Sequence, residues 1–355
     1  MIKISTDKKN ILVAPLNWGL GHATRCIPII NALIDYGFNP IIASDGIALE
    51  LLQKEFPSLE TIELPSYHIE YAKKGSHFKL KLFLNSPKMI NAILSEKRKT
   101  RQIIKSHNIH GIVSDNRLGV VNSNIPSVFI THQLNVMTGN TTWITTQLHN
   151  LIIKKFDECW VPDVDAVPNL SGNLGHPEKK QANIKYIGPL SRLHKKNLTK
   201  KYDLMVILSG PEPQRTMLEE KLISELEAYT GTILFVKGKI EEQQVVEKKN
   251  QFTFYNYMNT EQIEIAFNES DKVLCRSGYT TVMDLAKLKK KAFFIPTPGQ
   301  YEQEYLAKKF KEEGLVPSCR QDKFKLKKLD KIDLYKGLRN FDSHIKWQDL
   351  LAVFE

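Results

Sequence analysis

The chain has 355 residues, 42% of them hydrophobic and 25% charged, with a formal net charge of +11. This composition excludes a disordered or fibrous protein, and the length favours two globular domains over one. No apolar run approaches the roughly 20 residues of a membrane-spanning helix, and the N-terminus lacks a signal-peptide core. We therefore expect a cytoplasmic protein.

Strands and helices alternate through the first half of the chain. The apolar runs predict strands at 11–16, 40–43, 61–64, 111–115, 127–131 and 159–161. Helical spacing follows Gly21-His22 as far as Gly37, recurs at 47–55 and continues in a basic region. This alternation predicts a parallel sheet with helices on both faces.

A second alternating series follows a polar, basic stretch at 183–201, which we interpret as a linker. It predicts strands at 203–208, 233–237, 252–255, 271–275 and 291–296. Helices are predicted at 214–229, 261–268 and 282–288, and an amphipathic one at 344–354. The fold class is therefore α/β, with two Rossmann-like doubly wound domains, 1–190 and 191–341, facing each other across a cleft.

The segment 271–307 carries the clearest chemical pattern. A buried-type strand leads into the hydroxyl-rich turn Ser277–Thr281 and then a helix, whose free N–H groups suit a phosphate. Asp284, one turn into that helix, can accept hydrogen bonds from the two hydroxyls of a ribose. Glu302-Gln303 opens the following helix and offers a polar pair to a second ring. These features predict a nucleotide-sugar pocket, against the alternative of an ordinary βαβ unit with polar turns.

This pattern resembles the donor-binding half of glycosyltransferase family 28, which includes the enzyme that forms lipid II of peptidoglycan. The matching positions are Arg276-Ser277-Gly278, Thr281, Asp284, Pro296 and Glu302-Gln303. Asp284 departs from the pattern, because the family has the longer Glu there. The resemblance implies the two-domain GT-B fold and a C-terminal helix, 342–355, that crosses back onto the first domain.

The resemblance also implies where a UDP-sugar donor binds. The implied donor-binding residues are Arg192, Ser209, Gly210, Met258, Ser277, Gly278, Thr280, Thr281, Asp284, Glu302 and Gln303. Ser209-Gly210 stands where the family has a diphosphate loop, although an ordinary turn is the alternative. Arg192 matches a phosphate-side arginine, or else is a solvated linker residue. The sugar nucleotide is a co-substrate, and no cofactor is expected.

The first predicted strand leads into a loop containing Gly19, Gly21, His22 and Arg25. Its glycines allow a tight turn and close approach to a ligand. The loop resembles the Gly-His element that faces the acceptor in family 28, where the histidine is a candidate base. A similar Gly-x-Gly-His-x-x-Arg element marks nucleotide-sugar hydrolases of the same fold. Helix capping is the alternative role for His22.

Two further catalytic candidates follow predicted strands. Asp115 ends one strand, and His132 lies just past another, with Asn135 close behind. In parallel sheets such strand ends face the ligand cleft. Asp163-Val164-Asp165 has the form of a metal-binding DxD triplet, but it stands far from the nucleotide pattern, and we interpret it as incidental. Cys26, Cys159, Cys275 and Cys319 lack metal-ligand spacing and are expected to be buried thiols, so no metal site is predicted.

The positive charge is concentrated between Lys73 and Lys105. This window holds ten Lys or Arg residues and one acid, Glu96, and the rest of the chain has 40 basic and 38 acidic residues. Apolar residues are interleaved with the charges: Phe78, Leu80, Leu82, Phe83, Leu84, Met89 and Ile90. The pattern favours a peripheral site on an anionic membrane at its inner face, against a solvated helix that buries its apolar residues.

The function predicted from these observations is transfer of a sugar from a UDP-sugar to an acceptor hydroxyl, with inversion and without a metal. The acceptor is a glycan, a lipid or a lipid-linked sugar. A nucleotide-sugar hydrolase is the alternative within enzymes. A nucleic-acid-binding protein that uses the basic window is the alternative from another class, disfavoured because the window lacks a nucleic-acid motif.

Overall fold

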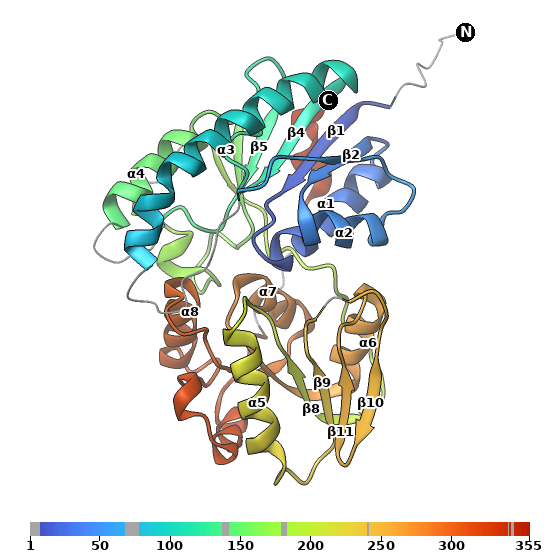
Figure 1. Ribbon diagram of the computed structural model, residues 1–355, viewed down its shortest axis with the longest axis vertical. Coiled ribbons are helices and arrows are strands. Elements are labelled where there is room, and N and C mark those ends of the chain that lie inside the picture. The colour runs from blue at the N-terminus through green and yellow to red at the C-terminus, as the bar shows by residue number, and fades with distance from the viewer. Residues whose placement is uncertain are drawn as a thin grey trace.

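The fold is taken from a computed structural model of the chain. It describes residues 8–67, 78–136, 142–178, 183–239, 241–339, 341 and 344–355, with only the backbone described at 78–89 and 144. The molecule has two sheets, one above the other, each with helices on both faces (Figure 1). The predicted fold class is confirmed.

The first sheet is parallel throughout, in the order β3-β2-β1-β4-β5-β6-β7. Its strands are β1 (Asn10–Pro15), β2 (Asn39–Ser44), β3 (Thr61–Glu63), β4 (Ile109–Asp115), β5 (Ser127–Ile130), β6 (Glu158–Val161) and β7 (Ile184–Tyr186). The central strands β1 and β4 are buried over nearly their whole length because both faces of the sheet are covered. The helices around it are α1 (Leu20–Asp35), α2 (Gly46–Glu55), α3 (Phe78–Ser106), α4 (Thr142–Ile153) and the short η3 (Gly172–Leu174).

The second sheet has the order β10-β11-β9-β8-β12-β13 and is parallel except for its edge strand β10. Its strands are β8 (Tyr202–Ile207), β9 (Ile233–Val236), β10 (Val246–Lys249), β11 (Phe252–Tyr255), β12 (Ser270–Cys275) and β13 (Lys291–Phe294). The helices are α5 (Gln214–Leu226), α6 (Thr260–Glu269), α7 (Tyr279–Leu288), α8 (Tyr301–Glu312), η4 (Gln321–Lys323) and η5 (Leu326–Leu334).

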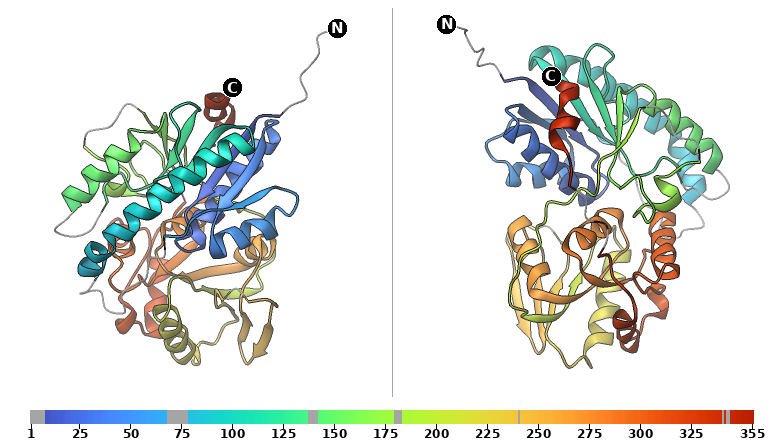
Figure 2. Two further views of the ribbon diagram at one scale, coloured as in Figure 1. Left: turned by 45° about the horizontal axis from the view of Figure 1, so that its top comes forward. Right: turned by 180° about the vertical axis from the view of Figure 1, so that it is seen from behind.

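The C-terminal residues pack against the first sheet, on the face that is turned toward the viewer in the rear view (Figure 2). Helix α9 (Trp347–Leu351) leads into η6 (Ala352–Phe354). The Phe354 ring lies 6.3 Å from that of Phe38 and 6.4 Å from that of Trp160. Lys9 donates to the Phe354 carbonyl at 3.1 Å. This final helix is shorter than the predicted 344–354.

Three further details differ from the sequence-based expectation. The segment 183–201 is not entirely a linker, because β7 pairs with β6 inside it. The predicted turn Ser277–Thr281 ends earlier, since α7 begins at Tyr279 with Gly278 as its N-cap. Helix α4 and the edge strand β10 were not predicted.

Each sheet has a point where its strand order reverses, and ligands bind at such points beyond the carboxyl ends of the strands. In the first sheet this point lies between β1 and β4, and in the second between β8 and β12. His22 lies in the first turn of α1, which follows β1, and Asp115 is the last residue of β4. The loops that follow β8 and β12 carry Ser209-Gly210 and Arg276–Gly278. The topology therefore directs the candidate residues of both domains to the two reversal points.

Candidate active site

His22 and Asp115 form a hydrogen-bonded pair at the reversal point of the first sheet. Asp115 is the last residue of β4, in register with Pro15 at the end of β1. His22 lies in the first turn of α1, directly after that strand. This geometry places His22 Nδ1 2.9 Å from Asp115 Oδ1. A histidine held by a carboxylate in this way is a frequent general base, because the carboxylate orients the ring.

Arg25, one turn further along α1, binds the same carboxylate through two nitrogens. Its Nε donates to Asp115 Oδ2 and its Nη2 to Asp115 Oδ1. Burial alone raises the pKa of Asp115, but Arg25 and His22 together hold that pKa well below its usual range. Burial, and then Arg25, lower the pKa of His22, against the opposing effect of Asp115. The pair is therefore set as an ionised carboxylate and a neutral imidazole.

His132 lies next to this pair but has a different environment. Arg25 Nη1 lies 3.3 Å from His132 Nδ1, and since a guanidinium can only donate, that nitrogen must accept. The proton of a neutral His132 is thus on Nε2, which lies 3.3 Å from Glu302 Oε2 without hydrogen-bond alignment. The ring stacks on Tyr279 of the second domain, with centroids 4.1 Å apart. His132 is consequently fixed on both sides, which makes it a weaker base candidate than His22.

The predicted donor loop, Arg276–Gly278, follows β12. Arg276 is buried and donates to the carbonyls of Ile295, Pro296 and Gln214, so it ties β13 and α5 to the loop. Burial lowers its pKa to about 10, and no ion pair to it occurs among the described residues. Ser277 is also buried, and its hydroxyl donates to the Gln303 carbonyl at 2.7 Å. The Ser277 hydroxyl is therefore occupied, and only the backbone N–H of Ser277 could make the predicted phosphate contact in this arrangement.

The first turn of α7 lies against the first domain. Thr280 Oγ1 donates to the Gly21 carbonyl at 3.2 Å, and the Tyr279 hydroxyl donates to the Pro162 carbonyl at 2.9 Å. Gly278 has open space where a side chain would be, and Thr281 is half-buried beside it. The α7 N-terminus, predicted to hold phosphate, thus faces the loop that carries His22.

Asp284 is joined to the interdomain segment. Ser191 Oγ donates to Asp284 Oδ1 at 2.6 Å, and burial raises the pKa of Asp284 to about 6. The neighbouring Arg192 donates to Thr260 Oγ1, which in turn donates to Glu55 of α2, each at 2.7 Å. Arg192 is therefore engaged between the two domains rather than solvated.

Glu302, in the first turn of α8, contacts the first domain. Gln133 Nε2 donates to Glu302 Oε2. Burial favours the protonated acid, but His132, Arg25 and Gln133 lower the pKa of Glu302 to about 2. Gln303 is buried, and its side-chain oxygen accepts from the Thr297 N–H at 2.8 Å. Of the predicted polar pair, Glu302 reaches the interdomain surface and Gln303 holds the loop after β13.

Ser209 and Gly210 lie in the loop after β8 and are exposed, with Gly210 at φ 101°. Met258 packs, partly buried, against the second-domain core near the start of α6. Gly19, the N-cap of α1, has φ 79°, which suits the tight turn expected there. Asn135 does not contact His22, Asp115 or His132 in this structure; its side chain donates to the Asn173 carbonyl.

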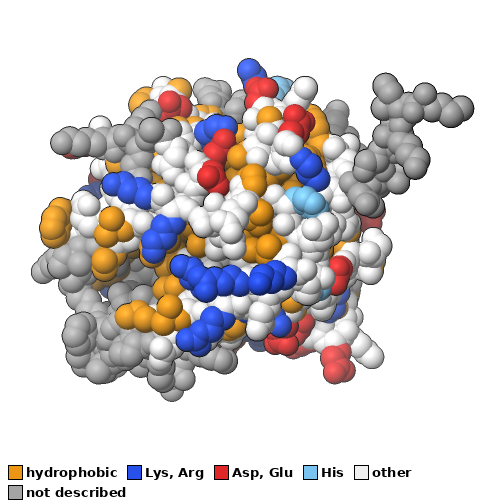
Figure 3. Space-filling model, turned by 90° about the horizontal axis from the view of Figure 1, so that it is seen from above, with side chains coloured by type: hydrophobic (Ala, Val, Ile, Leu, Met, Phe, Trp, Pro, Cys, Tyr) orange, Lys and Arg blue, Asp and Glu red, His pale blue; other side chains and the backbone are white. Residues whose placement is uncertain are grey.

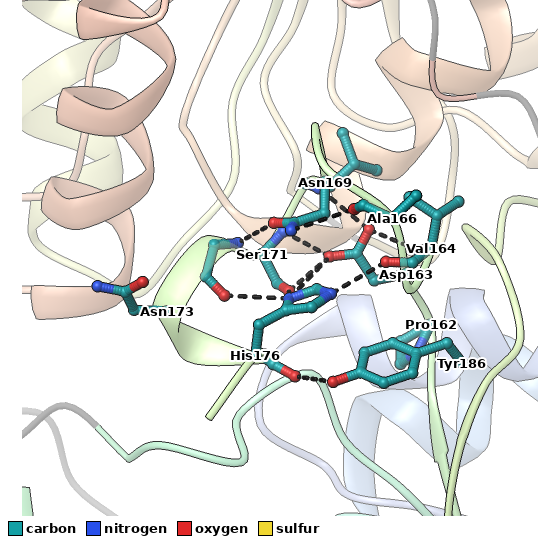
Figure 4. Close-up of polar contacts among 12 residues, drawn as sticks. Pro162, Asp163, Val164, Ala166, Asn169, Ser171, Asn173, His176 and Tyr186 are labelled. Carbon is teal, nitrogen blue, oxygen red and sulfur yellow. Dashed lines mark hydrogen bonds and ion pairs between the residues drawn. The ribbon is translucent and has the colours of Figure 1, made fainter. Parts of the chain in front are cut away.

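Asp163, the first residue of the Asp163-Val164-Asp165 triplet, binds the local backbone (Figure 4). Asp163 is buried, and its carboxylate accepts from the N–H groups of Val164, Leu170 and Ser171 at 2.7–3.0 Å. The Ser171 hydroxyl donates to it as well. These bonds occupy the acceptor capacity that a metal requires. Within the described ranges, no group of three or more potential metal-ligating side chains occurs.

The second domain matches a family model for the glycosyltransferase family 28 C-terminal domain, over residues 214–340. An uncharacterized glycosyltransferase of Methanopyrus kandleri is 21% identical over 313 residues, covering 84% of this chain and 86% of the relative. The chain is a glycosyltransferase of the GT-B fold, and its second domain is similar to glycosyltransferase family 28.

Further relatives agree with this assignment. A UDP-N-acetylglucosamine--N-acetylmuramyl-(pentapeptide) pyrophosphoryl-undecaprenol N-acetylglucosamine transferase of Haemophilus ducreyi is 23% identical over 188 residues, about half of each chain. The crystal structure of Acinetobacter baumannii MurG matches with a TM-score of 0.58 and 14% identity, over 98% of this chain and 99% of MurG. The glycotransferase of kitacinnamycin matches with a TM-score of 0.62 and 12% identity, over 92% and 89%. At these identities the two structures show the shared fold.

Proposed function

We propose that this glycosyltransferase moves a sugar from a UDP-sugar to an acceptor hydroxyl, with inversion at the anomeric carbon and without a metal. The observation that carries the proposal is the His22–Asp115 pair, at 2.9 Å, opposite the α7 N-terminus. The uridine preference follows from the similarity to family 28 and its UDP-sugar-using relative. The first domain binds the acceptor, and the second binds the donor.

The pair supplies a base for the acceptor. With Nδ1–H donated to Asp115, His22 Nε2 has a free lone pair that takes the proton from the acceptor hydroxyl. The acceptor oxygen attacks the anomeric carbon from the side opposite the diphosphate, which inverts the configuration. As the bond to the diphosphate breaks, the N–H groups at the start of α7 stabilise its charge, and the buried Arg276 adds a positive field.

The deciding experiment combines the purified protein with a UDP-sugar and candidate acceptors at neutral pH. UDP release that depends on the acceptor, with an inverted anomer in the product by NMR, supports the proposal. Equal turnover after EDTA treatment supports the metal-free mechanism. UDP release at a full rate without any acceptor identifies a hydrolase instead, and release by no nucleotide sugar contradicts the proposal.

We further propose that the first domain docks on anionic membranes, which favours a lipid-linked acceptor. On α3, Ile90 and Leu94 are 56% and 46% exposed and share a face with exposed Lys97, Arg98 and Arg101. Glu96, the acid of the basic window, is buried and paired inward with Arg117, so it does not offset this charge. Lys73 and Lys74 lie outside the described residues, as do the side chains of 78–89.

Helix α4 extends the same kind of surface. Its Trp143, Leu148 and Leu151 are 73%, 57% and 58% exposed. Both α3 and α4 lie on the outer side of the first domain (Figures 1 and 2). Seen from above, Lys and Arg side chains alternate there with hydrophobic ones (Figure 3). Apolar side chains interleaved with basic ones suit an anionic membrane surface, where the apolar groups can insert and the basic groups meet the lipid headgroups. Among the described helices, none combines the length and apolarity that crossing a bilayer requires.

A further inference from the structure

Arg117 lies two residues after Asp115 and has a fully buried side chain. Between them, Asn116 has a left-handed backbone with φ 57°. Such a conformation is uncommon outside glycine and concentrates at functional sites. The turn gives the two residues different partners: Asp115 contacts α1, and Arg117 contacts the loops that leave the neighbouring strands.

The Arg117 guanidinium binds the chain at or just past the ends of three strands, β1, β2 and β3. Its Nε donates to the carbonyl of Pro15, the last residue of β1, at 2.9 Å. Its Nη1 donates to the carbonyl of Pro65, just past β3, at 3.2 Å. Its Nη2 pairs with Asp45, the residue that follows β2. All three contacts lie at the carboxyl edge of the first sheet, where we place the acceptor.

The network continues into the catalytic loop on one side. Asp45 Oδ2 accepts from Asn17 Nδ2 at 3.1 Å, and Asn17 Oδ1 accepts from the Ala48 N–H at 3.3 Å. Asn17 is held closely, since a Cβ added at Gly46 would lie 2.5 Å from its Nδ2. Asn17 begins the loop that leads through Gly19 to His22. Asp45 therefore connects Arg117 to the segment that places the base.

On its other side the network reaches α3. Arg117 Nη1 lies 2.7 Å from Glu96 Oε1. Glu96 Oε2 accepts from the Tyr67 hydroxyl at 2.5 Å and from the Gly119 N–H at 3.0 Å. Burial raises the pKa of Glu96, and Arg117 opposes that effect. The outer helix α3 is thus linked to the same guanidinium as the loops around the acceptor edge.

A buried ion network is a costly way to stabilise a core, because well-packed apolar side chains serve equally well or better. This network lies where four loops must be placed relative to one another. We propose that Arg117, acting through Asp45 and Asn17, is a positioning residue that fixes the acceptor-side loops around His22 and Asp115. Its guanidinium contacts are with the protein itself: Pro15, Pro65, Asp45 and Glu96. The inference rests on the proposed function, since it assigns His22 as the base.

The test uses Asp45→Asn and Asn17→Ala, because Arg117 variants risk unfolding a domain that depends on their buried charge. Misplacement of a catalytic group by about 1 Å costs on the order of 100-fold in rate. We expect turnover roughly 10- to 100-fold lower in both variants, with an unchanged UDP-sugar dissociation constant, because the donor domain is untouched. Glu158→Gln is the matched control: it removes an acid paired with Lys185 in the same domain, away from the cleft, and should keep its turnover.

Amide hydrogen exchange gives a second readout that needs no activity. In Asp45→Asn, exchange should accelerate in 16–22 and 64–67 and stay unchanged in β5 and β6. Faster exchange across the whole first sheet, or wild-type turnover in both variants, overturns the positioning role. If the wild type has no transferase or hydrolase turnover, the proposed function fails, and the exchange experiment still decides whether the network holds the loop.

Discussion

His22 and His132 both contact Arg25, but they differ in which ring nitrogen stays available. His132 Nδ1 accepts from Arg25, and its Nε2 faces Glu302. His22 shares its Nδ1 between Arg25 Nη2, at 2.8 Å, and Asp115 Oδ1, at 2.9 Å. Donation to Asp115 leaves Nε2 free as a base, whereas acceptance from Arg25 puts the proton on Nε2. The bidentate grip of Arg25 on Asp115 keeps that carboxylate ionised and so favours the first arrangement.

The base assignment predicts the behaviour of His22→Ala. Loss of a general base typically costs roughly 100- to 10,000-fold in rate. Turnover should fall by about that factor, while the UDP-sugar dissociation constant measured by calorimetry stays nearly unchanged. His110→Ala is the control, because His110 lies at the opposite end of β4 and accepts from the Asn10 N–H. Near-normal turnover in His22→Ala would move the base to another residue, with His132 the next to test.

The raised pKa of Asp284 predicts a pH dependence of donor binding. In the proposed donor site the ribose hydroxyls donate to the ionised carboxylate, so UDP-sugar affinity should fall as the pH drops through about 6. Calorimetry should use a UDP-sugar as the ligand. The terminal phosphate of UDP itself titrates near pH 6 and would obscure the titration of Asp284, whereas a UDP-sugar has no such group. Asp284→Asn should bind more weakly at pH 7.5, and its affinity should not change between pH 5 and 7.5. A wild-type affinity that is constant over this range contradicts a ribose contact.

The same group also affects folding stability in a defined direction. Its pKa in the folded chain is about 6, above the ordinary 3.8, so the folded state binds the proton more tightly. Its contribution is most favourable below about pH 4 and is lost as the pH rises through 6. Relative to wild type, Asp284→Asn should therefore gain thermal stability as the pH rises from 4 to 7. The opposite trend in melting temperature indicates that the carboxylate is not desolvated.

At the scale of elements, long periodic segments could be predicted and short or ambiguous ones could not. The apolar run of β1 and the glycines after it predicted both the strand and the catalytic loop. Helix α4 was missed because its sequence, TWITTQLHNLII, is rich in the β-branched residues typical of strands. Strands β7 and β10 are three and four residues long and largely exposed, so they have no clear alternation. Their pairing is decided by the neighbouring strand.

Most contacts between residues far apart in the sequence could not be predicted, for a different reason. Strand ends indicated that His22 and Asp115 share one edge of the sheet, and the structure brings them together. Arg25 also binds Asp115, and this contact depends on the geometry of α1 and on the register of β4. The contact of Glu302 with Gln133 depends on how the domains meet. The adjacency of Asp115 and Arg117 in SDNR was visible, but their opposite directions depend on the left-handed Asn116.

The exposed face of α3 predicts the effect of charge reversal. Each basic residue near an anionic surface contributes about 1 kcal/mol, so Lys97→Glu, Arg98→Glu and Arg101→Glu together should release the protein from anionic vesicles. Flotation at low salt measures this, with neutral vesicles as reference. Lys248→Glu, Lys249→Glu and Lys331→Glu make an equal charge change on exposed residues of the second domain and should leave binding intact. Equal wild-type binding to anionic and neutral vesicles contradicts membrane docking.

At the scale of the whole molecule, the two domains meet through direct contacts beside the candidate site. Glu302 contacts Gln133, and Tyr279 reaches the Pro162 carbonyl. On the α8 side, the Tyr305 hydroxyl accepts from the Asn173 N–H, and Lys309 donates to the Asn169 carbonyl. The donor loop and the acceptor loop are therefore positioned by the same interface. A change in domain separation should alter the distance between the base and the donor sugar.

Gly21 offers the sharpest test of that relation. It lies in the first turn of α1, and a Cβ at this position would lie 2.8 Å from Thr280 Oγ1 of the donor loop. Alanine is favoured over glycine in a helix by about 1 kcal/mol, so Gly21→Ala should not destabilise the first domain itself. The added methyl group should instead push the domains apart and lower turnover by roughly 10- to 100-fold, with an unchanged UDP-sugar dissociation constant. Small-angle scattering should show a larger radius of gyration than the wild type in the presence of donor. Wild-type turnover together with an unchanged radius would mean that Thr280 yields to the methyl group and that the interface does not set the distance between base and donor.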